Sequence, residues 1–90
     1  MADITVKESS TGALTPVSEV DLAQITNTTL INELVANGVL SPTGANGQQN
    51  DWHLVGKDNV YIQEQNRTLA ELGFADGDTI TVIAKPAGAN

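Results

Sequence analysis

The chain has 90 residues, of which 40% are hydrophobic and only 3% aromatic, so it can build one small aliphatic core and no second domain. Four Lys and Arg residues stand against eleven Asp and Glu, which gives a formal net charge of −7. This acidity disfavours an unaided nucleic-acid binder and a protein that adheres to an anionic membrane, so we expect neither partner. The absence of cysteine excludes disulfides, thiolate metal sites and a cysteine nucleophile.

The start of the sequence, MADITVKESS, has neither the basic segment nor the apolar segment of a signal peptide. No apolar run approaches the length of a membrane span. We therefore expect a cytoplasmic protein, and a monomer.

The first elements in chain order read as a β-hairpin. Residues 3–8 alternate in the strand period with Ile4 and Val6 on one face, and the stretch 9–12, SSTG, is typical of a turn. Alternation resumes in the stretch ALTPVSEVDLA. Because Pro16 cannot donate a ladder hydrogen bond, this second strand should lie at a sheet edge or begin near that residue.

A helix is predicted next, over residues 28–37. Apolar residues recur there at helical spacing: Leu30, Ile31, Leu34 and Val35. Asn27 or Thr28 can cap its start, and Gly38 stands where a helix ends in a left-handed residue. Pro42 prevents the helix from resuming.

The second half of the chain is predicted as a loop, short strands, a helical turn and a long last strand. The expected elements are a loop at 41–51, strands at 52–55 and 60–62, a helical turn with Leu69 and Leu72 inward, a turn at 76–78, a strand at 79–84 and no periodicity at 85–90. These elements predict an α+β fold, in which a mixed sheet of four or five strands packs on one helix and the first and last strands pair centrally. We expect one domain over residues 1–85 and a flexible C-terminal tail over 86–90.

The order and spacing of these elements resemble the β-grasp fold of ubiquitin and its relatives. The most specific part is RTLAELGFADGDTITVIAK at 67–85, and the stretch 54–58 also resembles the ubiquitin strand that ends in a glycine–lysine turn. The combination DWHLVGKDNVYI…LAELGFADGDTITVI is similar to the small ubiquitin-like proteins of bacterial type VII secretion loci.

The resemblance implies a role for the C-terminus. Ubiquitin-like modifiers and sulfur carriers work through a C-terminal glycine beyond the last strand, whose carboxylate an activating enzyme adenylates with ATP. In this sequence Gly88 and Ala89 stand where the two glycines of the family would be, and Asn90 follows. Either trimming exposes Gly88 or Ala89, or the activating enzyme tolerates Asn90, or the protein is never activated.

The resemblance also implies an exposed apolar patch for partner contact, to which Val55 and Ile83 correspond. By strand alternation, Leu54 and Val82 should be buried instead. Among the three lysines, Lys57 on the turn after the strand is the candidate acceptor if chains form.

No residue pattern points to catalysis, a metal or a cofactor. His53 is the only histidine and is expected to be a surface strand residue, since one histidine without cysteine cannot build a zinc site. Asp76 and Asp78 flank a turn glycine and are expected to form the turn.

The function predicted from sequence is therefore that of a non-enzymatic, bacterial ubiquitin-like protein modifier in a conjugation pathway. Its partners would be an activating (ThiF-like adenylating) enzyme, conjugating enzymes and a processing protease. The alternative is a non-conjugated interaction or regulatory protein of the type VII secretion kind. A sulfur carrier is a third alternative, which Asn90 disfavours.

Overall fold

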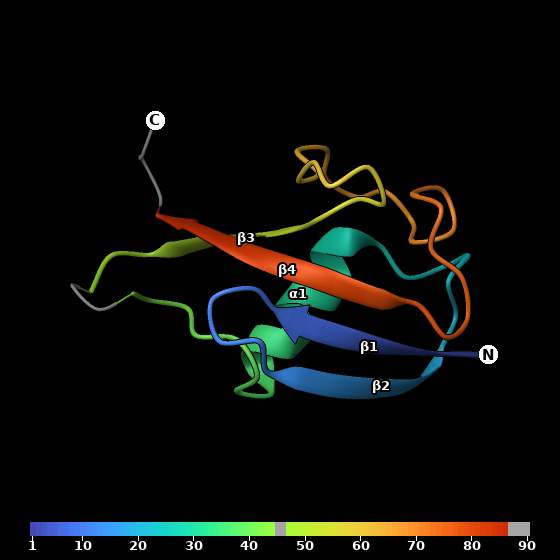
Figure 1. Cartoon of the computed structure of the whole chain (residues 1–90), viewed down its shortest axis with the longest axis horizontal. Coiled ribbons are helices and arrows are strands. Elements are labelled where there is room, and N and C mark those ends of the chain that lie inside the picture. The colour runs from blue at the N-terminus through green and yellow to red at the C-terminus, as the bar shows by residue number, and fades with distance from the viewer. Residues whose placement is uncertain (45–46, 87–90) are drawn as a thin grey trace.

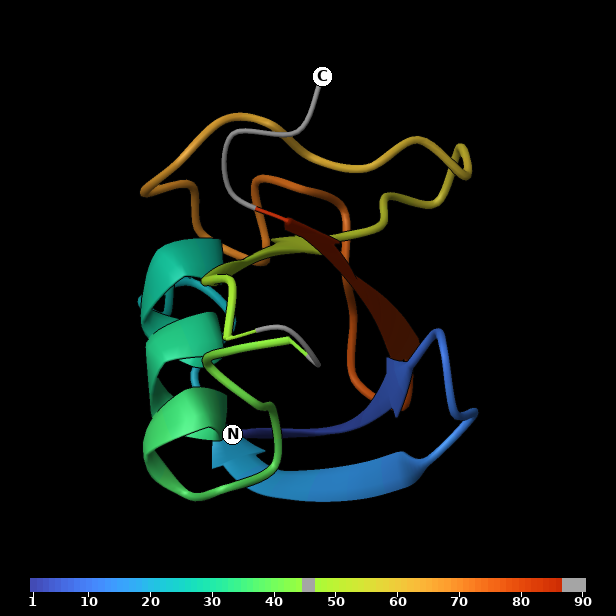
Figure 2. The ribbon, with the colours of Figure 1, turned by 90° about the vertical axis from the view of Figure 1, so that its left-hand side faces the viewer.

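Four strands and one helix make up the computed structural model, which describes residues 1–44 and 47–86 (Figure 1). Their bounds are β1 Ala2–Glu8, β2 Leu14–Val20, α1 Asn27–Ala36, β3 Asn50–Leu54 and β4 Thr79–Pro86. The strands form one mixed sheet in the order β2-β1-β4-β3, and α1 packs against its concave side (Figure 2). The α+β, β-grasp architecture predicted from the sequence is confirmed.

β1 and β4 form the centre of the sheet, as predicted for the first and last strands. They run parallel, with Val6 beside Ile80, while each also pairs antiparallel with an edge strand. Alternate residues of both strands face α1 and are buried there with aliphatic side chains of the helix and loops. The fully buried side chains are Val6, Leu30, Leu40, Leu54, Leu69, Ile80 and Val82.

β2 is an edge strand, which explains how it accommodates a proline. Pro16 lies opposite Thr5 of β1. Its missing N–H costs no ladder hydrogen bond, because no strand pairs with the free edge of β2. The prediction of an edge position is confirmed.

The turn between β1 and β2 is organised by the carboxylate of Glu8. It accepts hydrogen bonds from the Ser10 hydroxyl at 2.7 and 2.8 Å and from the Thr11 hydroxyl at 2.8 Å. The amides of Ser10 and Thr11 also donate to it, at 3.0 and 3.1 Å. These donors, the Ser10 hydroxyl foremost, lower the pKa of Glu8 below its usual value of 4.5.

The helix begins one residue earlier than predicted, and its cap is Thr26 rather than Asn27 or Thr28. The hydroxyl of Thr26 accepts a hydrogen bond from the amide of Thr29 at 3.1 Å. At the other end Gly38 has φ +77°, the left-handed conformation that was expected to terminate the helix.

Asn27 does not cap the helix, because its side chain is hydrogen-bonded to a loop that is distant in the sequence. Its side-chain amide donates to the carbonyl of Glu64 at 2.7 Å, and its oxygen accepts from the amide of Arg67 at 3.1 Å. The side chain is buried and both of its polar atoms are hydrogen-bonded, so it fixes the start of α1 against residues 64–67.

The strands of the second half differ from the prediction at their ends. β3 begins at Asn50, inside the expected loop 41–51, because that residue pairs with Pro86 and its amide donates to the carbonyl of Pro42 at 2.9 Å. β4 continues to Pro86, two residues past the expected end at residue 84, so the first residue of the expected tail 86–90 belongs to the sheet. The expected strand at 60–62 is wrong, since only an isolated bridge joins Tyr61 to Val55.

The stretch after residue 67 forms a single hydrogen-bonded turn around Thr68 and Glu71. The Thr68 hydroxyl accepts from the amide of Glu71, while the Glu71 carboxylate accepts from the amide and hydroxyl of Thr68. This is a reciprocal capping box, and its donors, the Thr68 amide foremost, lower the pKa of Glu71. The turn buries Leu69 and leaves Leu72 half-buried against the core, so both lie inward as predicted.

Candidate functional site

The face of the sheet opposite α1, called here the outer face, carries both predicted contact residues. Ile80 and Val82 point toward the core with no exposed surface, so the odd-numbered residues of β4 point outward. Ile83 is one of these outward residues and is half-buried, opposite His53 of β3.

Val55 reaches the same face one step beyond the end of β3. Its amide donates to the carbonyl of Thr81 at 2.8 Å, which extends the β3–β4 ladder by one pair. Val55 and Ile83 are therefore diagonal neighbours on adjacent strands, close enough for one partner side chain to contact both. Leu54 and Val82, the residues predicted to be buried, have no exposed surface. The geometry permits the predicted patch, and its role in partner contact stays a prediction.

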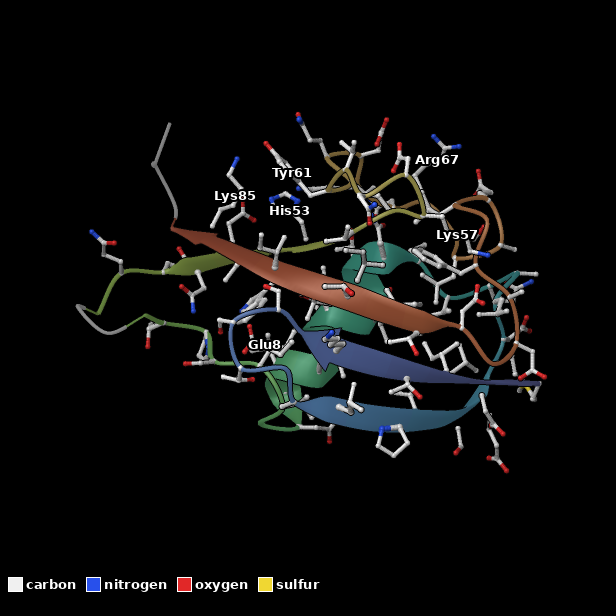
Figure 3. The ribbon with its side chains drawn as sticks, in the orientation of Figure 1. Glu8, His53, Lys57, Tyr61, Arg67 and Lys85 are labelled. Carbon is white, nitrogen blue, oxygen red and sulfur yellow. The ribbon has the colours of Figure 1, made fainter. Side chains whose placement is uncertain are left out.

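His53 sits in the outer face and is held on both sides of its ring. Its Nδ1 lies 3.0 Å from the carbonyl oxygen of Ile62, and its Nε2 lies 3.0 Å from a carboxylate oxygen of Asp51. The ring of Tyr61 packs over it at a centroid distance of 5.4 Å (Figure 3). As a result the histidine side chain is only 16% exposed, more enclosed than the surface residue that was predicted.

Tyr61 also connects this cluster to the end of β4. Lys85 Nζ donates to the Tyr61 hydroxyl at 2.8 Å and lies 4.4 Å from the centre of its ring. Figure 3 shows the labelled side chains of His53, Tyr61 and Lys85 gathered at the end of the sheet where β4 finishes. The contact ties the last residues of β4 to the segment that follows β3.

Sequence reasoning missed Asp51 and Tyr61 as members of this cluster. Alternation from His53 places Asp51 on the same face, so that one signal was present in the sequence. Nothing in the sequence pairs Tyr61 with Lys85, because they are 24 positions apart and belong to different elements.

Lys57, the candidate acceptor lysine, is ion-paired. Its Nζ lies 2.9 Å from a carboxylate oxygen of Asp78, and its side chain is 56% exposed. That contact, followed by a hydrogen bond from the amide of Ala75, lowers the pKa of Asp78. Lys57 can act as a nucleophile only when this pair opens and the amine loses its proton.

A side chain at Gly56 would crowd the glycine–lysine turn. A Cβ there would lie 2.8 Å from Asp58 Oδ1 and 3.3 Å from the carbonyl oxygen of Val60. The glycine therefore lets the chain turn tightly between β3 and Val60, which presents Lys57 at the tip.

The remaining predicted site residues, Gly88, Ala89 and Asn90, lie outside the residues that the structure describes. Within 1–44 and 47–86, no group of three or more His, Asp or Glu side chains is placed to hold a metal ion. Asp76 and Asp78 take part in a turn instead, where Asp76 accepts from the amide of Asp3 at 2.7 Å. The one helix in the same ranges is too short and too polar to cross a membrane.

Comparison with solved structures shows that ubiquitin-like proteins share this fold. The ubiquitin of Caldiarchaeum subterraneum superposes with a TM-score of 0.65 at 23% sequence identity, over 98% of each chain. A chain of the MycP5-free ESX-5 inner membrane complex gives 0.59 at 17% identity over 99% of this chain, which spans only 22% of that longer chain. The EccD5 ubiquitin-like domain from Mycobacterium xenopi gives 0.50 at 16% identity over 94% of each chain. No protein-family model and no curated protein matches the sequence.

Proposed function

We propose that this chain, which has the ubiquitin-like β-grasp fold, is a protein modifier whose C-terminal segment is activated by a separate enzyme and joined to a target. The chain supplies recognition and a reactive carboxylate, while catalysis belongs to the activating and conjugating enzymes. One observation carries the proposal: β4, which contributes Ile83 to the outer face, is followed directly in the sequence by a run of small residues, Ala87, Gly88 and Ala89.

The arrangement suits a protein that an activating enzyme binds by one surface while the C-terminal segment enters its active site. The outer face offers Val55 and Ile83 for docking, and the Tyr61–Lys85 contact fixes the end of β4 beside them. A segment of small residues that starts from a fixed point can enter a narrow active site, because it lacks bulky side chains to obstruct it. We infer that the outer face docks on the activating enzyme while this segment reaches its ATP.

The chemistry follows that of carboxylate activation. The terminal carboxylate attacks the α-phosphate of ATP, pyrophosphate leaves, and an acyl adenylate forms. A thiol or amine then attacks the acyl carbon and AMP leaves, which yields a thioester or an amide. Either Gly88, Ala89 or Asn90 carries the carboxylate, according to whether a protease trims the segment.

A second candidate is a non-covalent docking domain in a secretion or regulatory complex. It is favoured by the likeness to the EccD5 ubiquitin-like domain and to the ESX-5 complex chain, which at 16% and 17% identity is a likeness of fold. In this case the outer face is used and the C-terminal segment is not.

Deletion of residues 87–90 from an N-terminally tagged protein separates the two functions. The cut leaves Pro86 paired with Asn50, so the sheet is intact and a loss of function cannot be assigned to unfolding. For a modifier, denaturing blots from the native host show high-mass species with the full chain and none with the deletion. Mass spectrometry of the junction peptide then names the acyl residue.

The matched variant is Ile83→Ala, which keeps the C-terminal segment and weakens the outer face. A modifier loses conjugates with this variant too, because the activating enzyme no longer docks. A docking domain loses its complex with Ile83→Ala and keeps it with the deletion. That second pattern, or the absence of any high-mass species while the native operon is expressed, contradicts the modifier proposal.

A further inference from the structure

The free edge of β3 has backbone groups that no neighbouring strand uses. Val55 donates to Thr81 of β4, so by antiparallel alternation the amides and carbonyls of residues 50, 52 and 54 point away from β4. At one end the amide of Asn50 donates to Pro42, and at the other the carbonyl of Leu54 accepts from Ile62 at 2.7 Å. Trp52 lies between them, and neither its N–H nor its C=O has a backbone partner in the described part of the chain.

These groups open into a groove of about 300 Å³ between β3 and α1. Five consecutive residues of β3 line it although their side chains alternate in direction, which shows that the strand edge itself is one wall. Ile31 and Val35, one turn apart on α1, form the opposite wall, and Trp52 and Ile62 add apolar surface. Figure 2 shows α1 crossing the concave side of the curved sheet, with its first turn next to β3.

The groove contains carboxylates and no lysine or arginine. Its acidic lining residues are Asp51 and Glu64, both exposed, and Asp51 is hydrogen-bonded to Nε2 of His53, which also lines the groove. The whole chain adds a net charge of −7. A cationic occupant is therefore attracted, and a second copy of this acidic chain is repelled.

We propose that this groove binds a short extended segment of a basic partner protein, which adds to the edge of β3 by pairing with Trp52. The distance from Asn50 to Leu54 admits about three residues at roughly 3.3 Å each. The segment places an aliphatic side chain between α1 and Trp52 and a lysine or arginine near Glu64. The groove shares Asp51 and His53 with the outer face but includes neither Val55 nor Ile83, so it serves a modifier or a docking domain equally.

A backbone-blocked peptide tests the proposal on the full chain. The probe is acetyl-Gly-Lys-Val-Lys-Gly-amide, added during ¹H–¹⁵N NMR of the labelled protein. We expect weak binding, with a dissociation constant of about 0.1–1 mM, and amide shifts at Trp52, Leu54 and Ile31. The same peptide methylated at its three central amide nitrogens cannot pair with the strand edge and should bind at least about tenfold more weakly.

Two exposed glutamates provide a matched pair of variants. Glu64→Lys reverses charge in the groove, whereas Glu33→Lys makes the same change on an exposed part of α1 outside it. We expect the first to weaken the lysine peptide by about three- to tenfold and the second by less than about twofold. An analogue with glutamate in place of lysine should not bind the unmodified protein.

Several results overturn the proposal. They are binding of the glutamate or N-methylated peptide as tight as that of the lysine peptide, shifts that map to the β2 edge instead, and an absence of shifts at millimolar peptide. Shifts at Trp52 that depend on protein concentration without peptide would identify a second copy as the occupant. If Glu64→Lys fails to fold, the three peptides still decide the matter on the unmodified protein.

Discussion

Aliphatic residues on the two faces of β4 differ in how deeply they are buried. On the inner face, Ile80 and Val82 have no exposed surface and hold the sheet to α1. On the outer face, Ile83 is half-buried beside His53 and contributes to a surface that a partner can reach. A shift of one residue along the strand therefore moves a side chain from the packed core to the partly exposed outer face.

The largest expected effect comes from the same substitution made on each face. Ile80→Ala leaves a cavity in the centre of the core and should lower the free energy of unfolding by about 2–5 kcal/mol. Ile83→Ala removes only partly buried surface and should cost about 1 kcal/mol or less. Urea unfolding monitored by Trp52 fluorescence measures both.

Equal losses from the two variants would show that Ile83 belongs to the core in solution. The proposed docking role of the outer face would then lose its basis, because an effect of Ile83→Ala on partners could be an effect on folding. A large gap between the two supports the division of the strand into a structural face and an exposed face.

A smaller effect is expected at the outer face itself, from Tyr61→Phe. The variant keeps the ring over His53 and removes the hydroxyl that accepts from Lys85, so the loss of stability should be about 1 kcal/mol or less. Amide hydrogen exchange at the end of β4 should accelerate, while exchange at Ile80 in the middle of the sheet should follow the global stability. Tyr61→Leu, which removes the ring as well, is the stronger comparison. Unchanged exchange at Lys85 in both variants would mean that the cluster does not fix the strand end.

The elements that sequence predicted well are those whose burial is periodic. The alternation in β1 and β4 and the helical spacing of Leu30 and Leu34 each record one buried face, so the central strand pair and the helix follow from the pattern alone. The end of the helix was also predictable, because Gly38 adopts a left-handed conformation that few other residues tolerate.

What sequence could not predict depends on contacts between distant residues. Asn27 is an acceptable helix cap by type, but its side chain is committed to residues 64–67, and the cap moves to Thr26. β3 gains polar Asn50 because Pro86 continues β4 alongside it, which no local pattern records. The candidate site divides in the same way: the resemblance suggested Val55 and Ile83 and alternation placed them opposite the buried Leu54 and Val82, whereas the Tyr61–Lys85 contact required the fold.

The smallest effect concerns the charged turns at the ends of the strands, and it appears as a dependence of stability on pH. Glu8 has a pKa below its usual value of 4.5 because hydroxyl and amide groups of Ser10 and Thr11 stabilise its charged form. A carboxyl group with a lowered pKa in the folded state binds protons less readily there than in the unfolded chain. Its stabilising contribution is therefore present above pH 4.5 and is lost as the pH falls through the lower, folded value.

Glu8→Gln should flatten this part of the curve when the free energy of unfolding is measured from about pH 6 to about pH 2.5. Ser10→Ala is the informative partner, because it keeps the carboxyl group and removes the donor that contributes most to its shift. If the hydrogen bonds are the cause, both single variants reduce the slope and the double variant reduces it no further than Glu8→Gln alone. A slope that is unchanged in Ser10→Ala but reduced in Glu8→Gln would assign the effect to the donors that remain, the amides of Ser10 and Thr11 and the Thr11 hydroxyl.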